Sequence, residues 1–156
     1  MKKNWIWIIV AIIVLVIVWY FVYATNPSPS NQSSTQSSTQ TPLTSEPVLY
    51  LGSSDALGSY LVASNKMTLY TYSNDTPGLS TCTGDCSTKW PPYIVPSSQG
   101  LTADSGISGT LGTFTRDDGT LQLTYNEMPL YFWGQDINPG DTNGNGVAGL
   151  WSVAKP

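Results

Sequence analysis

The hydrophobic pattern divides the chain into three segments. Residues 5–23 are an unbroken run of 19 apolar or aromatic residues. As a helix this run would span about 28 Å, close to the hydrocarbon thickness of a bilayer. Residues 26–47 contain almost only Ser, Thr, Gln, Asn and Pro, a composition that does not support a packed core. We therefore predict a transmembrane helix within residues 1–25, a disordered linker over 26–47 and a folded domain over 48–156.

The flanks of the apolar run predict its orientation. Lys2 and Lys3 precede the run, and aromatic residues stand at both of its ends, as at membrane interfaces. A cleaved signal peptide is the alternative, because Val22-Tyr23-Ala24 is an acceptable cleavage motif, but the run exceeds the usual 7–15-residue signal core. We expect a retained single-pass anchor in the cell membrane, with the N-terminus cytoplasmic and the C-terminal domain extracytoplasmic.

Residues 48–156 show the two-residue period of β-strands. Leu121, Leu123 and Tyr125 alternate with Gln122 and Thr124, which predicts one buried face and one solvated face. No segment after residue 47 has convincing helical periodicity. The predicted fold class is a small all-β domain, with further strands over 48–51, 60–64, 67–72, 111–115, 128–133 and 150–154.

The domain contains an internal repeat. Six residues recur at a constant offset of 61, and the repeat predicts one pseudo-symmetric domain of two hairpin units. Each hairpin is expected to have a two-residue turn led by Asn, at 65–66 and 126–127. Pro129 lacks an amide donor, so its strand should lie at a sheet edge. The matching residues are Asn65, Met67, Leu69, Tyr70, Asp75 and Trp90 with Asn126, Met128, Leu130, Tyr131, Asp136 and Trp151.

Each repeat carries a Tyr, an aromatic residue two positions later and an Asp three positions after that. The period of a strand places the two aromatics on one face and the Asp at the strand end, where it can accept backbone N–H groups. The structural interpretation is core packing and turn capping. The alternative is an aromatic platform with an acidic rim, which would bind a sugar, a peptidoglycan fragment or a cation. The candidate binding residues are Tyr70, Tyr72, Asp75, Tyr131, Trp133 and Asp136.

The doubled pattern, with Cys82-x-x-x-Cys86 and Trp90-Pro-Pro92 after the first copy, resembles the secreted repeat family with the Tyr-x4-Asp motif, often predicted lipoproteins. The resemblance covers nearly all of residues 48–156. It implies an envelope or secreted location and no particular activity. Many members begin with a lipobox cysteine, where this chain has an apolar run. Members often have His after the final Trp, where this chain has Ser152, so no role of that His carries over.

The two cysteines predict a disulfide. Cys82 and Cys86 lie in the part expected outside the cell, where the environment is oxidising. The alternative is a redox-active pair, although the usual redox spacing has two intervening residues and this one has three. The chain contains no His, so neither a zinc site nor a c-type haem site can be completed around these thiols.

A polar loop near the C-terminus suggests one cofactor. Asp141, Asn143 and Asn145, followed by Gly146, match the first half of a calcium-binding loop. The twelfth position, where calcium loops have a bidentate Glu, is Ser152. The alternative is a tight turn before the last strand. Calcium is therefore a candidate, and no other cofactor is expected.

Charge and composition narrow the function classes. Beyond the apolar run, four basic and ten acidic residues give a net charge of −6, which argues against nucleic-acid binding. Without His there is no Ser–His or Cys–His nucleophile system, and Asp117 and Asp118 are expected to be turn residues. We predict a non-enzymatic surface module, either binding or structural, facing a cell-wall or surface ligand. The alternatives are a calcium-stabilised envelope domain and a redox or electron-transfer accessory that uses Cys82 and Cys86.

Overall fold

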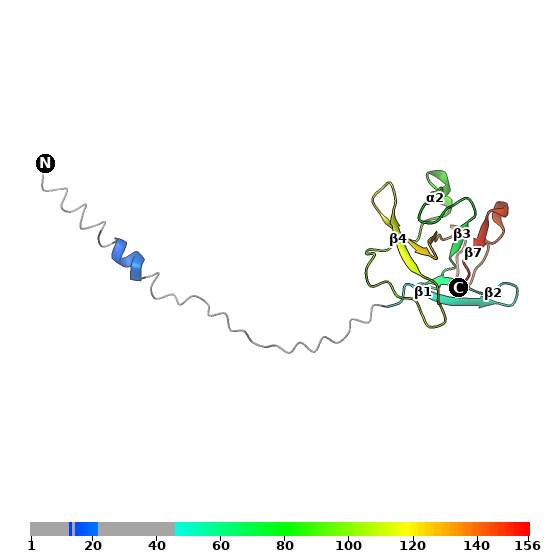
Figure 1. The fold of residues 1–156 in the computed structure, drawn as a ribbon, viewed down its shortest axis with the longest axis horizontal. Helices are drawn as coiled ribbons and strands as arrows, with labels where there is room; N and C mark the ends of the chain where they lie inside the picture. The colour runs from blue at the N-terminus through cyan, green and yellow to red at the C-terminus, as the bar shows by residue number, and fades with distance from the viewer. Residues whose placement is uncertain (1–12, 14, 22–45) are drawn as a thin grey trace. The chain divides into compact units, whose positions relative to one another are not determined.

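The computed structural model describes residues 13, 15–21 and 46–156, which belong to two separate units (Figure 1). In the first unit the described residues, 13 and 15–21, are helical and exposed. No helix among the described residues is long and apolar enough to cross a membrane. Most of the predicted anchor, and the linker up to residue 45, lie outside the described residues.

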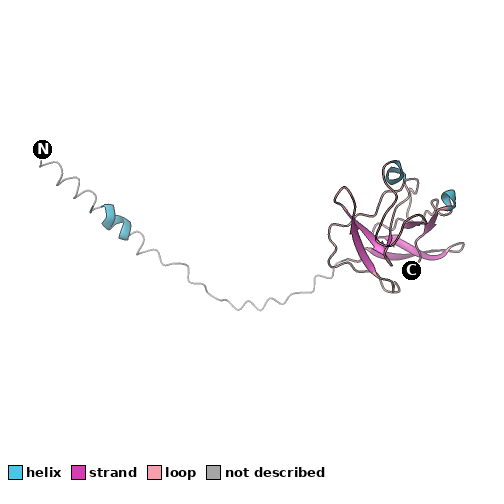
Figure 2. Cartoon of the chain, turned by 45° about the horizontal axis from the view of Figure 1, so that its top comes forward, coloured by secondary structure: helices cyan, strands magenta, loops and turns pink. Residues whose placement is uncertain are grey.

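Residues 46–156 form short antiparallel strands joined by long loops (Figure 2). The strands make three small sheets, in the orders β1–β2, β3–β7 and β4–β5–β6. This confirms the all-β prediction. Two short helices were not expected, because about one turn is too short to show periodicity. The elements are β1 (Leu49–Ser54), β2 (Gly58–Ala63), β3 (Tyr70–Tyr72), α2 (Asp85–Lys89), β4 (Leu111–Thr115), β5 (Leu121–Tyr125), β6 (Met128–Pro129), η1 (Val147–Gly149) and β7 (Trp151–Val153).

The hairpins β1–β2 and β4–β5 occupy equivalent places in the two repeats. Leu49 pairs with Ala63, and Leu111 pairs with Tyr125, so the two registers are 62 residues apart. The sequence match of the later residues has an offset of 61. The second repeat is therefore one residue shorter than the first between its hairpin and its Tyr-x4-Asp motif.

The difference of one residue lies in the turn after each hairpin. In the second repeat Asn126 and Glu127 both have a positive φ, of 49° and 67°, and form the predicted two-residue turn. In the first repeat the Ala63 N–H donates to the Met67 carbonyl, which leaves the three residues 64–66 in the turn. The prediction of a two-residue turn is wrong there: Lys66 has a positive φ of 66°, as its counterpart Glu127 does, and the turn contains one residue more.

Strand β5 is buried on both faces, contrary to the alternation read from the sequence. Gln122 is 0% exposed and Thr124 is 4% exposed. The Gln122 side chain donates to the Leu130 carbonyl (2.8 Å) and accepts from Arg116 Nη1 (2.5 Å), so its polar atoms are satisfied inside the protein. Pro129 lies in β6, which among residues 46–156 pairs with β5 alone, and the predicted edge position is confirmed.

The buried residues form two clusters of different character. One cluster is mainly aliphatic and contains Leu49, Leu61, Leu69, Leu123 and Leu130. The other is mainly aromatic and joins the two repeats. The aromatic cluster holds most of the predicted binding residues. Its buried members are Tyr60, Val62, Tyr70, Cys82, Trp90, Tyr131, Trp151 and Val153.

Candidate functional site

Tyr70 and Tyr131 meet at the centre of the aromatic cluster. The Tyr70 N–H donates to the Tyr131 carbonyl (2.9 Å), and the Tyr131 N–H donates to the Tyr70 carbonyl (3.0 Å). This antiparallel bridge relates the two repeats by an approximate two-fold axis. Both tyrosines are 0% exposed, so neither ring can contact a ligand at the surface.

The two hydroxyl groups reach across this axis. Tyr70 donates to Asp136 Oδ2 and Tyr131 donates to Asp75 Oδ2, both at 2.5 Å. Each motif tyrosine is thus bonded to the aspartate of the other repeat. Buried hydrogen bonds to a charged acceptor are short and strong. The Tyr-x4-Asp motif therefore ties the two repeats together.

The second carboxylate oxygen of each aspartate caps a loop. Asp75 Oδ1 accepts the Thr81 N–H (2.7 Å), and Asp136 Oδ1 accepts the Asn143 N–H (3.0 Å). These contacts agree with the turn-capping interpretation. Asp75 is 7% exposed and Asp136 is 9% exposed. Both carboxylates are therefore engaged within the protein.

Burial changes the ionisation of this cluster. Burial raises the pKa of Tyr70 far above its usual range, and the hydrogen bond to Asp136 adds a smaller effect in the same direction. Burial, followed by the hydrogen bond to Asp75, does the same to the pKa of Tyr131. Burial also raises the pKa of Asp136, against the opposing effect of its hydrogen bonds. Both phenols stay neutral and act as donors at ordinary pH.

Four aromatic rings pack in a row in the same cluster. The inner pair, Trp90 and Trp151, is nearly parallel, with centroids 3.7 Å apart. Tyr72 stacks on Trp151 at 4.3 Å, and Trp133 lies 4.1 Å from Trp90. The inner rings are buried and the outer rings are half-buried. Tyr72 and Trp133 are thus the aromatic residues of the predicted binding set with exposed surface, and Trp133 borders a hollow of about 220 Å³.

The two ends of the tyrosine pair differ in their surroundings. Tyr70 also accepts the Gly144 N–H (3.3 Å) from the loop after Asp136. Tyr131 instead lies 2.6 Å from Ser80 Oγ. A phenol has one proton and a carboxylate can only accept, so Tyr131 donates to Asp75 and Ser80 donates to Tyr131.

Ser80 continues this chain of hydrogen bonds to Arg116. Ser80 Oγ accepts from Arg116 Nη1 at 3.3 Å, and Arg116 Nη2 donates to the Cys82 carbonyl at 3.0 Å. The guanidinium thus has three acceptors, the Ser80 hydroxyl, the Cys82 carbonyl and the Gln122 side-chain carbonyl, and all three are neutral. The chain runs from Arg116 through Ser80 and Tyr131 to Asp75. It connects the buried motif to a pocket at the surface.

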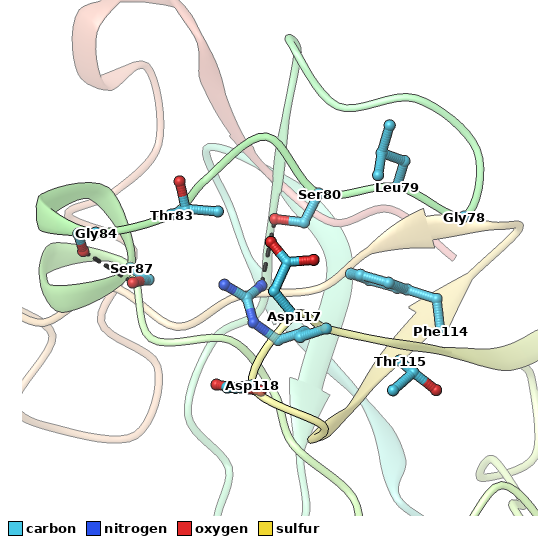
Figure 3. A pocket seen from close by; sticks show the side chains of 11 residues that line it. Gly78, Leu79, Ser80, Thr83, Gly84, Ser87, Phe114, Thr115, Asp117 and Asp118 are labelled. Atoms are coloured by element: carbon cyan, nitrogen blue, oxygen red, sulfur yellow. Dashed lines mark hydrogen bonds between the residues drawn. The ribbon is translucent and has the colours of Figure 1, made fainter.

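This pocket, called the Arg116 pocket below, has a volume of about 360 Å³. Figure 3 shows Thr83 and Ser87 at one end, Leu79 and Phe114 at the other, and the Asp117 carboxylate between them. The side chains come from the loop after β3, from α2 and from the β4–β5 hairpin. The lining residues are Gly78, Leu79, Ser80, Thr83, Gly84, Ser87, Phe114, Thr115, Arg116, Asp117 and Asp118.

The sequence interpretation missed this site. It placed Asp117 and Asp118 in a turn, and Asp118 does cap that turn by accepting the Thr120 N–H (2.9 Å). The hydrogen bonds from Thr120 lower the pKa of Asp118. One signal was available, because Arg116 is the single arginine of the chain and adjoins two acidic residues. Nothing in the linear pattern placed Ser80 or Thr83 beside it.

The pocket is not repeated by the pseudo-symmetry. At the 62-residue register of the hairpins, Arg116 corresponds to Ser54 and Gln122 corresponds to Tyr60. Ser54 Oγ accepts the Leu57 N–H of its own turn, and Tyr60 is buried in the aromatic cluster. The arginine and its amide acceptor therefore belong to one half of the domain.

The predicted disulfide is present beside the pocket. Cys82 and Cys86 are bonded, with their Cα atoms 5.2 Å apart. Cys82 is 0% exposed and packs in the aromatic cluster. The bond joins the loop that carries Ser80 to helix α2, so it holds one wall of the pocket.

The predicted calcium loop is held by its own hydrogen bonds. Asp141 Oδ2 accepts the N–H groups of Ile137 and Asn138, both at 2.8 Å, and Asn145 Oδ1 accepts the Val153 N–H (3.1 Å). Asn143 contributes its N–H to Asp136. The two hydrogen bonds to Asp141 lower the pKa of that carboxyl group. Among the described residues, no group of three or more Cys, Asp or Glu side chains is placed to hold a metal ion.

The comparisons with known proteins agree with the two-repeat architecture. A family described as a secreted repeat of unknown function matches residues 53–93 and 112–155. Each match begins in the first strand of one hairpin, β1 or β4, and extends through one Tyr-x4-Asp motif. No curated protein and no solved structure matches the chain. The chain therefore belongs to this family of secreted repeats and carries two copies of the repeat.

Proposed function

We propose that this protein is a membrane-tethered extracytoplasmic binding module, and that its ligand occupies the Arg116 pocket. The observation that carries the proposal is the fixed position of Arg116. Its guanidinium is held by the Gln122 side chain, the Ser80 hydroxyl and the Cys82 carbonyl. A polar group held in place before binding loses little entropy when a ligand arrives.

The buried Tyr-x4-Asp motif has a structural role, which leaves ligand binding to the Arg116 pocket. Tyr70 and Tyr131 donate their hydroxyl protons to Asp136 and Asp75, so the Tyr-x4-Asp motif of each repeat stabilises the domain. The Arg116 pocket is concave, combines apolar and polar groups, and has a volume within the range of about 300–1,000 Å³ typical of small-molecule sites.

Sequence and family support the location. A secreted repeat family is consistent with a domain outside the cell. The apolar run at residues 5–23 supplies a tether, and the polar segment at 26–47 would give the domain reach from the membrane. The tether is tested by fractionating cells that express the full chain. We expect the protein in the membrane fraction and its domain sensitive to protease added outside; a soluble, protected protein would contradict the tether.

The binding function is tested by nuclear magnetic resonance with the isotope-labelled full chain in detergent micelles. A library of small polar and amphipathic fragments should shift the resonances of Leu79, Thr83 and Phe114. Asp117→Asn should weaken these shifts. The matched control is Asp55→Asn, which changes an exposed Asp in the equivalent β1–β2 turn. Shifts that are absent, or that do not concentrate in the pocket, would contradict the proposal.

A further inference from the structure

We infer that the Arg116 pocket takes a neutral saccharide, an inference that rests on the proposed binding function. The lining of the pocket combines polar and apolar side chains. Thr83 and Ser87 lie at one end, Leu79 and Phe114 lie at the other with Thr115 beside them, and the Asp117 carboxylate lies between the two ends (Figure 3). A sugar ring has the matching character, because its C–H faces are apolar and its edges carry hydroxyl groups. The C–H face would lie on the Phe114 ring, and the hydroxyl edge would face Asp117 and Thr83.

The pocket carries charged groups of both signs. The lining contains two carboxylates, Asp117 and Asp118, and one guanidinium, Arg116. An anionic ligand would meet the two carboxylates in a chain whose net charge beyond the apolar run is already −6. A cationic ligand would be attracted by the two carboxylates but would also meet Arg116, whose hydrogen-bond acceptors are all neutral. A neutral ligand with many hydroxyl groups can form hydrogen bonds with all three charged groups and is repelled by none of them.

The pocket also has hydrogen-bonding groups that are free to contact a ligand. The described part of the chain provides no hydrogen-bond partner for the carboxylate of Asp117 or for the hydroxyl of Thr83. Ser87 Oγ donates to the Gly84 carbonyl (2.8 Å) and keeps its lone pairs as acceptors. The guanidinium of Arg116 has five N–H donors and makes three hydrogen bonds inside the protein, so donors remain for a ligand. The pocket therefore offers acceptors and donors together, as a polyol requires.

Titration calorimetry on the full chain tests this inference. The micelles should consist of a polyoxyethylene detergent, because sugar-headed detergents would compete for the site. The probes are neutral oligosaccharides of glucose, galactose, mannose and N-acetylglucosamine, with oligogalacturonate as the anionic arm, spermidine as the cationic arm and glycine as the zwitterionic arm. We expect saturable heat with at least one neutral oligosaccharide and none with the other three arms.

Variants connect the heat to the pocket. Asp117→Asn should weaken the binding of the neutral saccharide about tenfold, because one charge-assisted hydrogen bond is lost. Phe114→Leu should weaken it further by removing the ring, while Asp55→Asn should bind as the wild type does. The inference is overturned if no neutral saccharide binds, if a charged or zwitterionic probe binds more tightly, or if Asp55→Asn weakens binding as much as Asp117→Asn. Fragment binding in the pocket without saccharide binding would overturn this inference and leave the proposed function standing.

Discussion

Tyr70 and Tyr131 share two backbone hydrogen bonds, and each sends its hydroxyl to the aspartate that follows the other. The motif that recurs along the sequence is thus completed in space by two different repeats. The stacked Trp90 and Trp151 lie beside it, with Tyr70 edge-on to the first and Tyr131 edge-on to the second. The Tyr131 hydroxyl also contacts Ser80 Oγ, which in turn accepts from Arg116. The interior of the domain therefore helps to set the position of Arg116.

Removal of one motif hydroxyl should destabilise the domain. Tyr70→Phe leaves Asp136 Oδ2 without its phenol donor in a buried place, and an unsatisfied buried acceptor costs roughly 1–3 kcal/mol. The free energy of unfolding, from urea titrations of the full chain, measures the loss. Tyr72→Phe is the matched control, because the Tyr72 hydroxyl accepts a hydrogen bond from the exposed Asn74 Nδ2 (3.0 Å), and its effect should stay within about 0.5 kcal/mol. Equal losses in the two variants would refute the role of the crossed hydrogen bonds.

Stability should fall at alkaline pH. The folded pKa values of Tyr70 and Tyr131 are raised by burial, whereas an unfolded tyrosine ionises near pH ~10. Their contribution is fully present below that pH and is lost as the pH rises above it, because only the unfolded state then releases protons. Urea midpoints measured across this range should decline, and the decline should be shallower in Tyr70→Phe. Tyr93, whose pKa burial also raises, should maintain part of the slope. Identical slopes in variant and wild type would rule out a neutral, buried Tyr70.

Reduction of the disulfide should weaken the domain and its pocket. Closing the short loop between Cys82 and Cys86 stabilises the fold by about 2 kcal/mol in the loop-entropy model. The thermal midpoint of the full chain should therefore fall when a reductant is added. The double variant Cys82→Ala, Cys86→Ala should not respond to the reductant. A wild-type pair that cycles between its redox states with no change in midpoint would instead favour the redox-accessory alternative.

The 141–146 loop should depend on Asp141 as a turn cap. The lowered pKa of Asp141 means that its contribution is present above the ordinary Asp pKa of ~3.9 and is lost as the pH falls through the folded value. Asp141→Asn should therefore lower the urea midpoint at neutral pH and flatten its decline in acid. Calcium gives the second readout. A rise of the wild-type midpoint in millimolar calcium, absent in Asp141→Asn, would support the predicted calcium site; no rise in either protein would remove it.

Local sequence patterns correctly predicted turns and strand positions that depend on the backbone preferences of single residues. Asn126 and Glu127 both adopt a positive φ in the predicted turn, and Pro129 lies in the edge strand as its missing amide requires. The repeat and the disulfide were also readable. The solvated face expected for β5 was wrong, because Gln122 is covered by groups from other segments, and an alternating pattern does not reveal what packs above it.

The candidate site depended on contacts that no spacing rule reports. Strand periodicity placed each Asp at the end of its own strand, and its loop-capping hydrogen bonds were expected. The bond from the tyrosine of the other repeat joins residues 56 or 66 positions apart. The Arg116 pocket joins Ser80, α2 and the β4–β5 hairpin in the same way. Such sites become visible when the repeats are folded against each other.

The crossed hydrogen bonds have a consequence for copy number. A single repeat contains a tyrosine without an acceptor and an aspartate without a phenol donor, so it is an unfinished unit. A chain with one repeat would have to pair with a second chain to complete these hydrogen bonds. A third copy added to this domain would again be left open. This architecture therefore favours an even number of repeats in any chain that closes itself.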